Sequence, residues 1–280
     1  MPNRSDKSII NDIMSGFAFE SDITRFSWVN ALACAKAANL AYEKQATIHQ
    51  RVTQDWGMTQ YEFIHSGGTQ AFIASNESMI IVAFRGTEAT KLQDWATDLN
   101  FNLVPGQFGG KIHEGFHSAL SSVWRRTELM ITKFRENKDK SLWFTGHSLG
   151  AALATLAVAR LRADDHPVDG LYTFGQPRTG DRGFAREFNN DFKPYTFRFV
   201  NNSDTITRIP PRSLSYSHVG TFRYFDCDGR FHEDMGRWNR FLDRVKGGIE
   251  EFLDWGIDGL QDHSMDDYLT CIHRAYKKDN

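Results

Sequence analysis

The tract from Ser141 to Asn201 alternates between short apolar segments and helical patterns, and this alternation constrains the fold more than any other feature. SLWFTG (141–146), VDGLYTFG (168–175) and YTFRFVN (195–201) are typical of buried strands. The Ala-rich stretch 151–163 and residues 181–190 lie between them and are typical of helices. Strands joined by helices pair in parallel through right-handed crossovers, so the sequence predicts an α/β fold with a mostly parallel sheet.

Further elements are predicted on either side of this tract. YEFIH (61–65), TQAFIAS (69–75) and SMIIVAFR (78–85) are separated by turn residues and predict a meander of strands. Helices are expected over 24–42, over 116–134 with an end among residues 137–140, and over 265–278. No Pro-, Gly- or Ser-rich linker interrupts the 280 residues, so we expect a single domain over 1–280 with helices flanking the sheet.

Composition excludes several classes of partner. The 33 Lys and Arg against 35 Asp and Glu give a net charge of −2 without long blocks of either sign, which argues against nucleic acid. The longest apolar runs fall short of the ~18 residues that a membrane span requires. Residues 1–20 show no signal-peptide core, so a cytoplasmic protein or export by a signal-independent route is expected. Cys34, Cys227 and Cys271 lie far apart, which favours free buried thiols over disulfides or a metal knuckle.

The segment Gly146-His147-Ser148-Leu149-Gly150 has the pattern G-x-S-x-G between a predicted strand and a predicted helix. At such a sharp turn the serine is presented at the carboxyl edge of the sheet. Gly146 and Gly150 remove side chains that would clash where strand and helix pack. We therefore predict Ser148 as a nucleophile.

A serine nucleophile requires a histidine base and a carboxylate that orients it, in the chain order Ser, acid, His in this architecture. Asp204 follows the predicted strand 195–201 and is the best candidate acid. Asp226 and Asp228 remain alternatives.

His263 is the favoured base because it directly precedes the last predicted helix and so lies at the tip of a loop. His273 would lie inside that helix. His218 and His232 fall in predicted strands, where a histidine is more often structural.

An oxyanion requires two hydrogen-bond donors. The backbone N–H of Leu149, the residue after the nucleophile, is one candidate. Thr87 is the other, because Gly86 permits a sharp turn at the end of the strand 78–85.

A competing motif, His113-Glu114-Gly115-Phe116-His117, has the H-E-x-x-H pattern of zinc peptidases. That chemistry needs both histidines on one continuous helix, and Gly115 weakens such a helix. Glu128 and Glu136 would be the available third ligands. We keep a zinc metallopeptidase as a remote alternative and expect neither metal nor cofactor.

These residues resemble the class 3 lipase family, the α/β-hydrolases that include fungal triacylglycerol lipases, plant phospholipases A1 and feruloyl esterases. The resemblance covers most of the chain and rests on seven blocks in order: FRGT (84–87), DWATDLNF (94–101), IHEGFH (112–117), TGHSLGAALA (145–154), FGQPRTGD (174–181), NNSDTITRIPP (201–211) and DHSMDDYL (262–269). Ala151 departs from the family, since many relatives have Gly there.

The resemblance implies an α/β-hydrolase fold with Ser148, Asp204 and His263 as the catalytic triad and with Thr87 and Leu149 at the oxyanion. It also explains the zinc-like string as a family His-x-Gly-Phe segment.

A lid over about 88–110 is implied as well, and its candidate apolar residues are Leu92, Trp95, Leu99 and Phe101. A second apolar tract at helical spacing, 237–261, is either ordinary packing or a flap near His263.

The expected function is a serine carboxylic ester hydrolase, in first place a triacylglycerol lipase or esterase that acts through an acyl-enzyme. A phospholipase A1 and a feruloyl-type esterase are the alternatives within this class. The partner would then be a lipid or another small ester, bound at a lipid–water interface or from solution. A monomer is favoured. A binding protein without turnover is the third option, and it is disfavoured because every catalytic position is filled.

Overall fold

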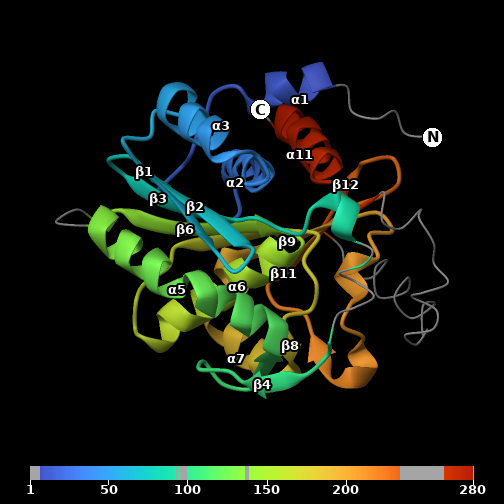
Figure 1. Ribbon diagram of the computed structural model, residues 1–280. Helices are drawn as coiled ribbons and strands as arrows, with labels where there is room; N and C mark the ends of the chain where they lie inside the picture. Colours follow the sequence, from blue (N-terminus) through green and yellow to red (C-terminus); the bar gives the residue numbers. More distant parts are fainter. Residues whose placement is uncertain (1–6, 93, 95–99, 136–138, 234–261, 280) are drawn as a thin grey trace.

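The structure, a computed structural model, describes residues 7–92, 94, 100–135, 139–233 and 262–279. Its centre is an eight-stranded sheet in the order β1-β2-β3-β6-β7-β9-β11-β12 (Figure 1). The strands are β1 (Gln60–Ser66), β2 (Thr69–Ser75), β3 (Met79–Phe84), β6 (Ser141–His147), β7 (Gly170–Phe174), β9 (Thr196–Asn201), β11 (Thr221–Phe225) and β12 (Phe231–His232). From β3 to β11 all neighbours pair in parallel, which confirms the predicted sheet.

Helices cover both faces of the sheet (Figure 1). On one face lie α1 (Lys7–Met14), α2 (Trp28–Leu40), α3 (Gln45–Gln50) and α11 (Met265–Asp279). On the other lie α5 (Glu114–Arg135), α6 (Leu149–Ala163) and α7 (Arg182–Phe192). Met79 and Ile81 of β3 pack into the core on the α2 side, whereas Ile80 and Val82 pack into the core on the α6 side. Burial on both faces explains the continuous apolar run of this strand.

Capping side chains determine where two predicted helices begin. The helix predicted from residue 24 starts at Trp28, because the Ser27 hydroxyl accepts a hydrogen bond from the Asn30 N–H. Asp181 caps α7 in the same way, by accepting from the Phe184 N–H at 2.8 Å. Ser27 and Asp181 therefore lie just outside their helices, although the predicted helices included them.

A second, four-stranded sheet in the order β10-β8-β5-β4 was not predicted. Its strands are β4 (Leu103–Pro105), β5 (Lys111–His113), β8 (Gly180–Asp181) and β10 (Tyr216–Ser217). Strands of two or three residues are too short to show an alternating pattern. Short helical turns occupy Ala89–Lys91, Lys193–Tyr195, Ile206–Arg208, Arg212–Leu214 and, in π form, Arg51–Asp55.

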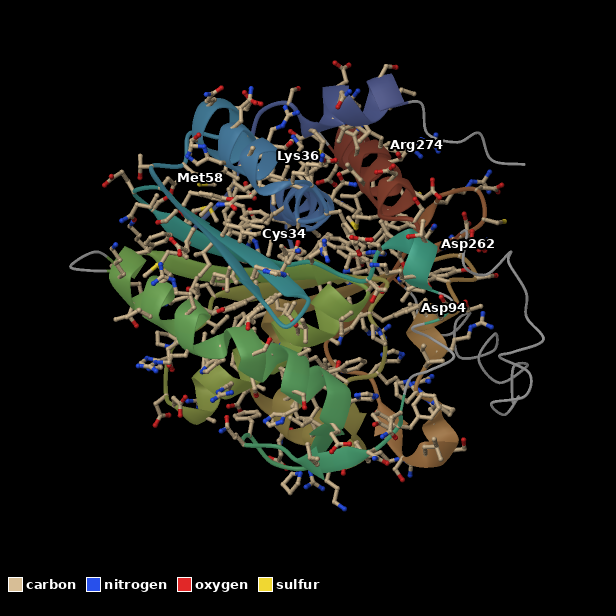
Figure 2. All side chains as sticks on the ribbon, viewed as in Figure 1. Cys34, Lys36, Met58, Asp94, Asp262 and Arg274 are labelled. Carbon is tan, nitrogen blue, oxygen red and sulfur yellow. The ribbon has the colours of Figure 1, made fainter. Side chains whose placement is uncertain are left out.

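The cysteines and the apolar segments can be compared with the sequence expectations. All three cysteines are free, and Cys34 is buried on α2 (Figure 2), as is Cys271 on α11. Cys227 is exposed, contrary to the expectation of three buried thiols, because it lies in the turn between β11 and β12. Among the helices that the structure describes, none is both long and apolar enough to span a bilayer.

The contact between β6 and α6 leaves no room for a side chain at Gly146, where a Cβ would overlap the Gly150 carbonyl. We expect Gly146→Ala to lower the free energy of unfolding by about 3 kcal/mol, because strand and helix must separate. Urea unfolding measures the loss. Gly68→Ala is the control: its Cβ meets nothing within 4 Å and the change costs only the strain of a φ of +83°, about 1 kcal/mol. Equal losses in the two variants would contradict this account.

Candidate active site

Ser148 lies at the turn between β6 and α6. Its backbone has φ 58° and ψ −129°, a strained conformation for a residue with a side chain. The Ser148 N–H donates to the Phe174 carbonyl at 3.0 Å, which fixes the turn to the end of β7. A Cβ at Gly150 would overlap the Phe84 carbonyl, so the helix also presses against the end of β3. The chain thus holds one serine in a conformation that most residues avoid.

The loop after β3 lies against this turn. A Cβ at Gly86 would stand 2.5 Å from the His147 carbonyl oxygen and 3.0 Å from Ser148 Cβ. Gly86 therefore lies close to the serine turn. Thr87, which is half-buried, is the next residue in the chain. Leu149 begins α6, so its N–H belongs to the first turn, whose donors have no acceptor within the helix. One predicted oxyanion donor thus directly follows Ser148, and the other directly follows Gly86, which lies against the serine turn.

Asp204 and His263 form a buried pair. His263 Nδ1 lies 2.9 Å from Oδ1 and 2.8 Å from Oδ2 of Asp204. Asp204 is fully buried in the loop after β9, and His263 is 3% exposed just before α11. A carboxylate in this position holds the Nδ1 proton and leaves Nε2 as the nitrogen that can exchange one.

Two further donors reach the Asp204 carboxylate. The Ile206 N–H donates to Oδ1 at 3.0 Å, and the Tyr268 hydroxyl donates to Oδ2 at 2.6 Å. The same hydroxyl accepts from the Asn201 N–H at 2.9 Å. Burial, and then the negative charge of Asp204, hold the pKa of Tyr268 well above its usual range, so the hydroxyl keeps its proton. The carboxylate therefore accepts from a backbone N–H and a hydroxyl in addition to His263.

Asp262 holds the histidine loop to the loop of Asp204. Its Oδ2 accepts from Asn202 Nδ2 at 3.1 Å and from the Ser203 N–H at 3.2 Å. Its backbone carbonyl accepts from Asn201 Nδ2 at 3.0 Å. Figure 2 shows Asp262 on the segment that leads into α11. The carboxylate one residue before His263 thus sets the place of the histidine.

Gly175 brings the backbone against the same pair. It has φ +58°, and a Cβ there would lie 2.7 Å from His263 Cε1 and 2.9 Å from Asp204 Oδ2. Sequence reasoning assigned no role to Gly175, Tyr268 or Asp262, although all three stand in quoted blocks. Their signal was a glycine directly after a predicted strand, and a tyrosine and an aspartate close to the candidate base.

The predicted acid and base are already paired, and Ser148 directly follows His147, whose ring centroid lies 4.4 Å from that of His263. Ser148 Oγ and His263 Nε2 are both buried, and neither has a hydrogen-bond partner in the described part of the chain. The bond between them is thus not formed in this structure, which is common in a site without substrate. A buried, unpaired hydroxyl and a buried, unpaired imidazole nitrogen on neighbouring segments are suited to proton transfer.

The rival residues lie in other places. Asp226 Oδ2 is 2.7 Å from His232 Nε2, but this half-buried pair belongs to the β11–β12 hairpin, where Asp226 also accepts from the N–H of Asp228. His218 directly follows β10. His273 lies within α11, as predicted. None of these histidines contacts Asp204 in the hydrogen bonds of the described residues.

The zinc-like string is divided between two elements. His113 ends β5, and α5 begins only at Glu114, so the continuous helix that a zinc site requires is not formed. His113 Nδ1 instead accepts from the Phe116 N–H at 3.3 Å. In the residues that the structure covers, no three His, Cys, Asp or Glu side chains gather as a metal site would need.

The predicted lid is described only in part. Leu92 is buried, and Phe101 is half-buried with its carbonyl accepting from the Tyr216 hydroxyl. Trp95 and Leu99 lie outside the described residues, as does the whole tract 237–261. Residues 103–105 form β4 and pair with β5, so this part of the predicted lid is a hydrogen-bonded strand.

Known proteins resemble this chain in sequence and in structure. Residues 81–214 match the family model described as lipase (class 3). A triacylglycerol lipase OBL1 of Arabidopsis thaliana is 26% identical over 85% of this chain and 63% of its own length. A lipase of Rhizomucor miehei is 32% identical over 62% of this chain and 48% of its own. A mono- and diacylglycerol lipase from Aspergillus oryzae has a similar structure, with a TM-score of 0.67 at 20% identity, covering 88% of this chain and 99% of that one.

The sheet order, the strained serine turn and the structural likeness give this chain the α/β-hydrolase fold. The family match identifies residues 81–214 further, as similar to class 3 lipases, and the curated relatives are lipases as well. The chain spans between about half and just under two thirds of the length of the two curated relatives.

Removing the Tyr268 hydroxyl should leave the buried Asn201 N–H without an acceptor and Asp204 with one donor fewer. We expect Tyr268→Phe to lower the free energy of unfolding by about 1–3 kcal/mol. Urea unfolding measures this, with Tyr195→Phe as the control, since Tyr195 is exposed. A Tyr268→Phe variant as stable as the control would show that this hydrogen-bond pair contributes nothing.

His113 makes stability depend on pH. Burial lowers its pKa from 6.5 to about 4, so as pH falls the unfolded chain binds the proton first. The stabilisation is complete above pH 6.5 and is lost between pH 6.5 and 4. We expect His113→Gln to reduce the wild-type loss of stability over this range by up to about 3 kcal/mol.

Urea unfolding at pH 7 and pH 4.5 provides the measurement. The exposed His65, changed to Gln, is the control. An unchanged pH dependence in His113→Gln would refute the assignment.

Proposed function

We propose that this protein is a serine carboxylic ester hydrolase that cleaves acylglycerol esters through an acyl-enzyme on Ser148. The observation that carries the proposal is the buried Asp204–His263 pair beside a strained serine with an unpaired hydroxyl. The triacylglycerol and mono- and diacylglycerol lipases that resemble the chain support this choice of substrate.

In the first half of the reaction, Ser148 Oγ attacks the ester carbonyl carbon while His263 Nε2 takes the hydroxyl proton. The carbonyl oxygen becomes an oxyanion, and the N–H groups of Leu149 and Thr87 are the proposed donors to it. The tetrahedral intermediate collapses, the bond to the alcohol breaks, and His263 gives its proton to the leaving alkoxide. The acyl group remains on Ser148.

In the second half, His263 takes a proton from water, whose oxygen attacks the acyl carbon. A second tetrahedral intermediate then releases the carboxylic acid, and the proton returns to Ser148 Oγ. Asp204 stabilises the imidazolium in both halves and holds its ring in place. The segment 88–110 is proposed to cover the acyl site, with a lipid surface favouring its open form.

The test is hydrolysis of p-nitrophenyl esters of increasing acyl length, with and without EDTA. We expect turnover that EDTA leaves unchanged and that falls roughly 10⁴-fold or more in Ser148→Ala. Ser121→Ala, on the exposed face of α5, is the control. A fluorophosphonate probe should label wild type at Ser148, as read by mass spectrometry of the modified peptide.

The substrate class follows from a second panel of triacylglycerol, phosphatidylcholine and methyl ferulate. Preference for triacylglycerol supports the proposal. Preference for phosphatidylcholine or for methyl ferulate would replace it with a phospholipase A1 or a feruloyl-type esterase. Activity that survives Ser148→Ala but is lost in EDTA would overturn the serine mechanism.

A further inference from the structure

A second histidine lies against the candidate base. His147, the last residue of β6, is 4% exposed, and its ring centroid is 4.4 Å from that of His263, with 34° between the ring planes. This geometry is a tilted stack of two imidazoles. The residue before the serine therefore contacts the ring that would take the serine's proton.

Tyr42 holds the His147 ring in turn. It follows α2, and its hydroxyl oxygen lies 2.7 Å from His147 Nδ1. Burial raises the pKa of Tyr42, so the hydroxyl stays protonated. Burial, and then the charge of His263, hold the pKa of His147 well below its usual range. The hydrogen bond thus joins two neutral groups, whichever of them donates.

The same hydroxyl also touches the oxyanion loop. A Cβ at Gly86 would overlap the Tyr42 hydroxyl and lie 3.0 Å from Ser148 Cβ. Tyr42 therefore stands between the loop that carries Thr87 and the ring that stacks on His263. Its position is fixed from both sides.

His263 needs such a support. Its two hydrogen bonds to Asp204 both use Nδ1, and Nε2 has no partner among the described residues. Hydrogen bonds through one nitrogen do not by themselves fix the tilt of the ring about that nitrogen. Proton transfer, however, requires Nε2 to face Ser148. A flat neighbour against the ring removes this freedom. The neighbour must also be uncharged, because a cation there would oppose the imidazolium that forms.

We propose that His147 and Tyr42 are positioning residues for His263. The neutral His147 ring, held by the Tyr42 hydroxyl, fixes the plane of the His263 ring. Its aromatic face also attracts the positive charge that His263 carries after it takes the proton. The inference rests on the proposed function. It assigns a chemical reason for an imidazole directly before the nucleophile.

The experiment compares four variants on a soluble p-nitrophenyl ester: His147→Phe, His147→Ala, Tyr42→Phe and the double variant Tyr42→Phe/His147→Phe. We expect His147→Ala to lower kcat about 10- to 100-fold with KM within twofold. His147→Phe keeps a flat neutral ring but loses the bond to Tyr42, so its kcat should fall about three- to tenfold, as in Tyr42→Phe, and less than in His147→Ala. Tyr42→Phe should lose about three- to tenfold in the wild-type background and nothing more in His147→Phe, since the hydroxyl acts through His147. Tyr195→Phe is the matched control.

A second readout does not depend on turnover. The proton of the His263–Asp204 hydrogen bond should give a downfield ¹H resonance that is sharp in wild type, broadened in His147→Phe and Tyr42→Phe, and broadened most in His147→Ala. A purely structural role would lower the urea midpoint and leave both kcat and this resonance unchanged. If His147→Ala does not fold, the Tyr42→Phe comparison carries the test.

Two results would overturn the proposal. One is a folded His147→Ala with kcat within twofold of wild type, and the other is an equal loss in His147→Phe and His147→Ala. Equal effects of Tyr42→Phe in both backgrounds would remove Tyr42 from it. A wild type that neither turns over esters nor reacts with the fluorophosphonate would instead refute the proposed function, while the resonance would still report on positioning.

Discussion

The close approach of β6, the serine turn and α6 is the constraint on which the rest of the site depends. At Gly146, Gly150 and Gly86 a single added carbon would meet backbone atoms of the neighbouring segment. The strained backbone of Ser148 is held by this packing, because a looser turn would relax to an ordinary conformation. The position of the hydroxyl is therefore set by β6, α6 and the loop after β3. These three segments can approach so closely only because glycine stands at each contact.

A buried carboxylate is the second requirement, and the chain satisfies it with neutral or backbone donors. Asp204 accepts from the Ile206 N–H, from the Tyr268 hydroxyl and from His263. Arg208 also lies close enough for the charge of Asp204 to act on its pKa. Hydrogen bonds from neutral groups stabilise the carboxylate while leaving its negative charge available to the histidine.

The sequence was sufficient for local features. The strand–helix alternation gave the parallel sheet, and the glycines around Ser148 gave the turn, because both depend on residues adjacent in the chain. Asp204 and His263 were predicted from the chain order Ser, acid, His and from their places in loops next to a predicted strand and a predicted helix. The contacts that Tyr268 and Gly175 make with Asp204, and the contact between His147 and Tyr42, could not be found in this way, because each joins residues from different elements. The small sheet was missed for another reason, since strands such as Gly180–Asp181 are too short for a pattern.

The packing of α11 links the site to a distant part of the fold. α11 lies against α2, and Asn39 Nδ2 donates to Asp266 Oδ1 at 2.8 Å across a sequence separation of 227 residues. His263 lies just before this helix, so its place depends on how α11 packs against α2 (Figure 1). A molecule with a complete sheet but an undocked α11 would carry the strained serine and the carboxylate without their base. Assembly of the proposed site is thus the last consequence of packing two helices that lie at opposite ends of the chain.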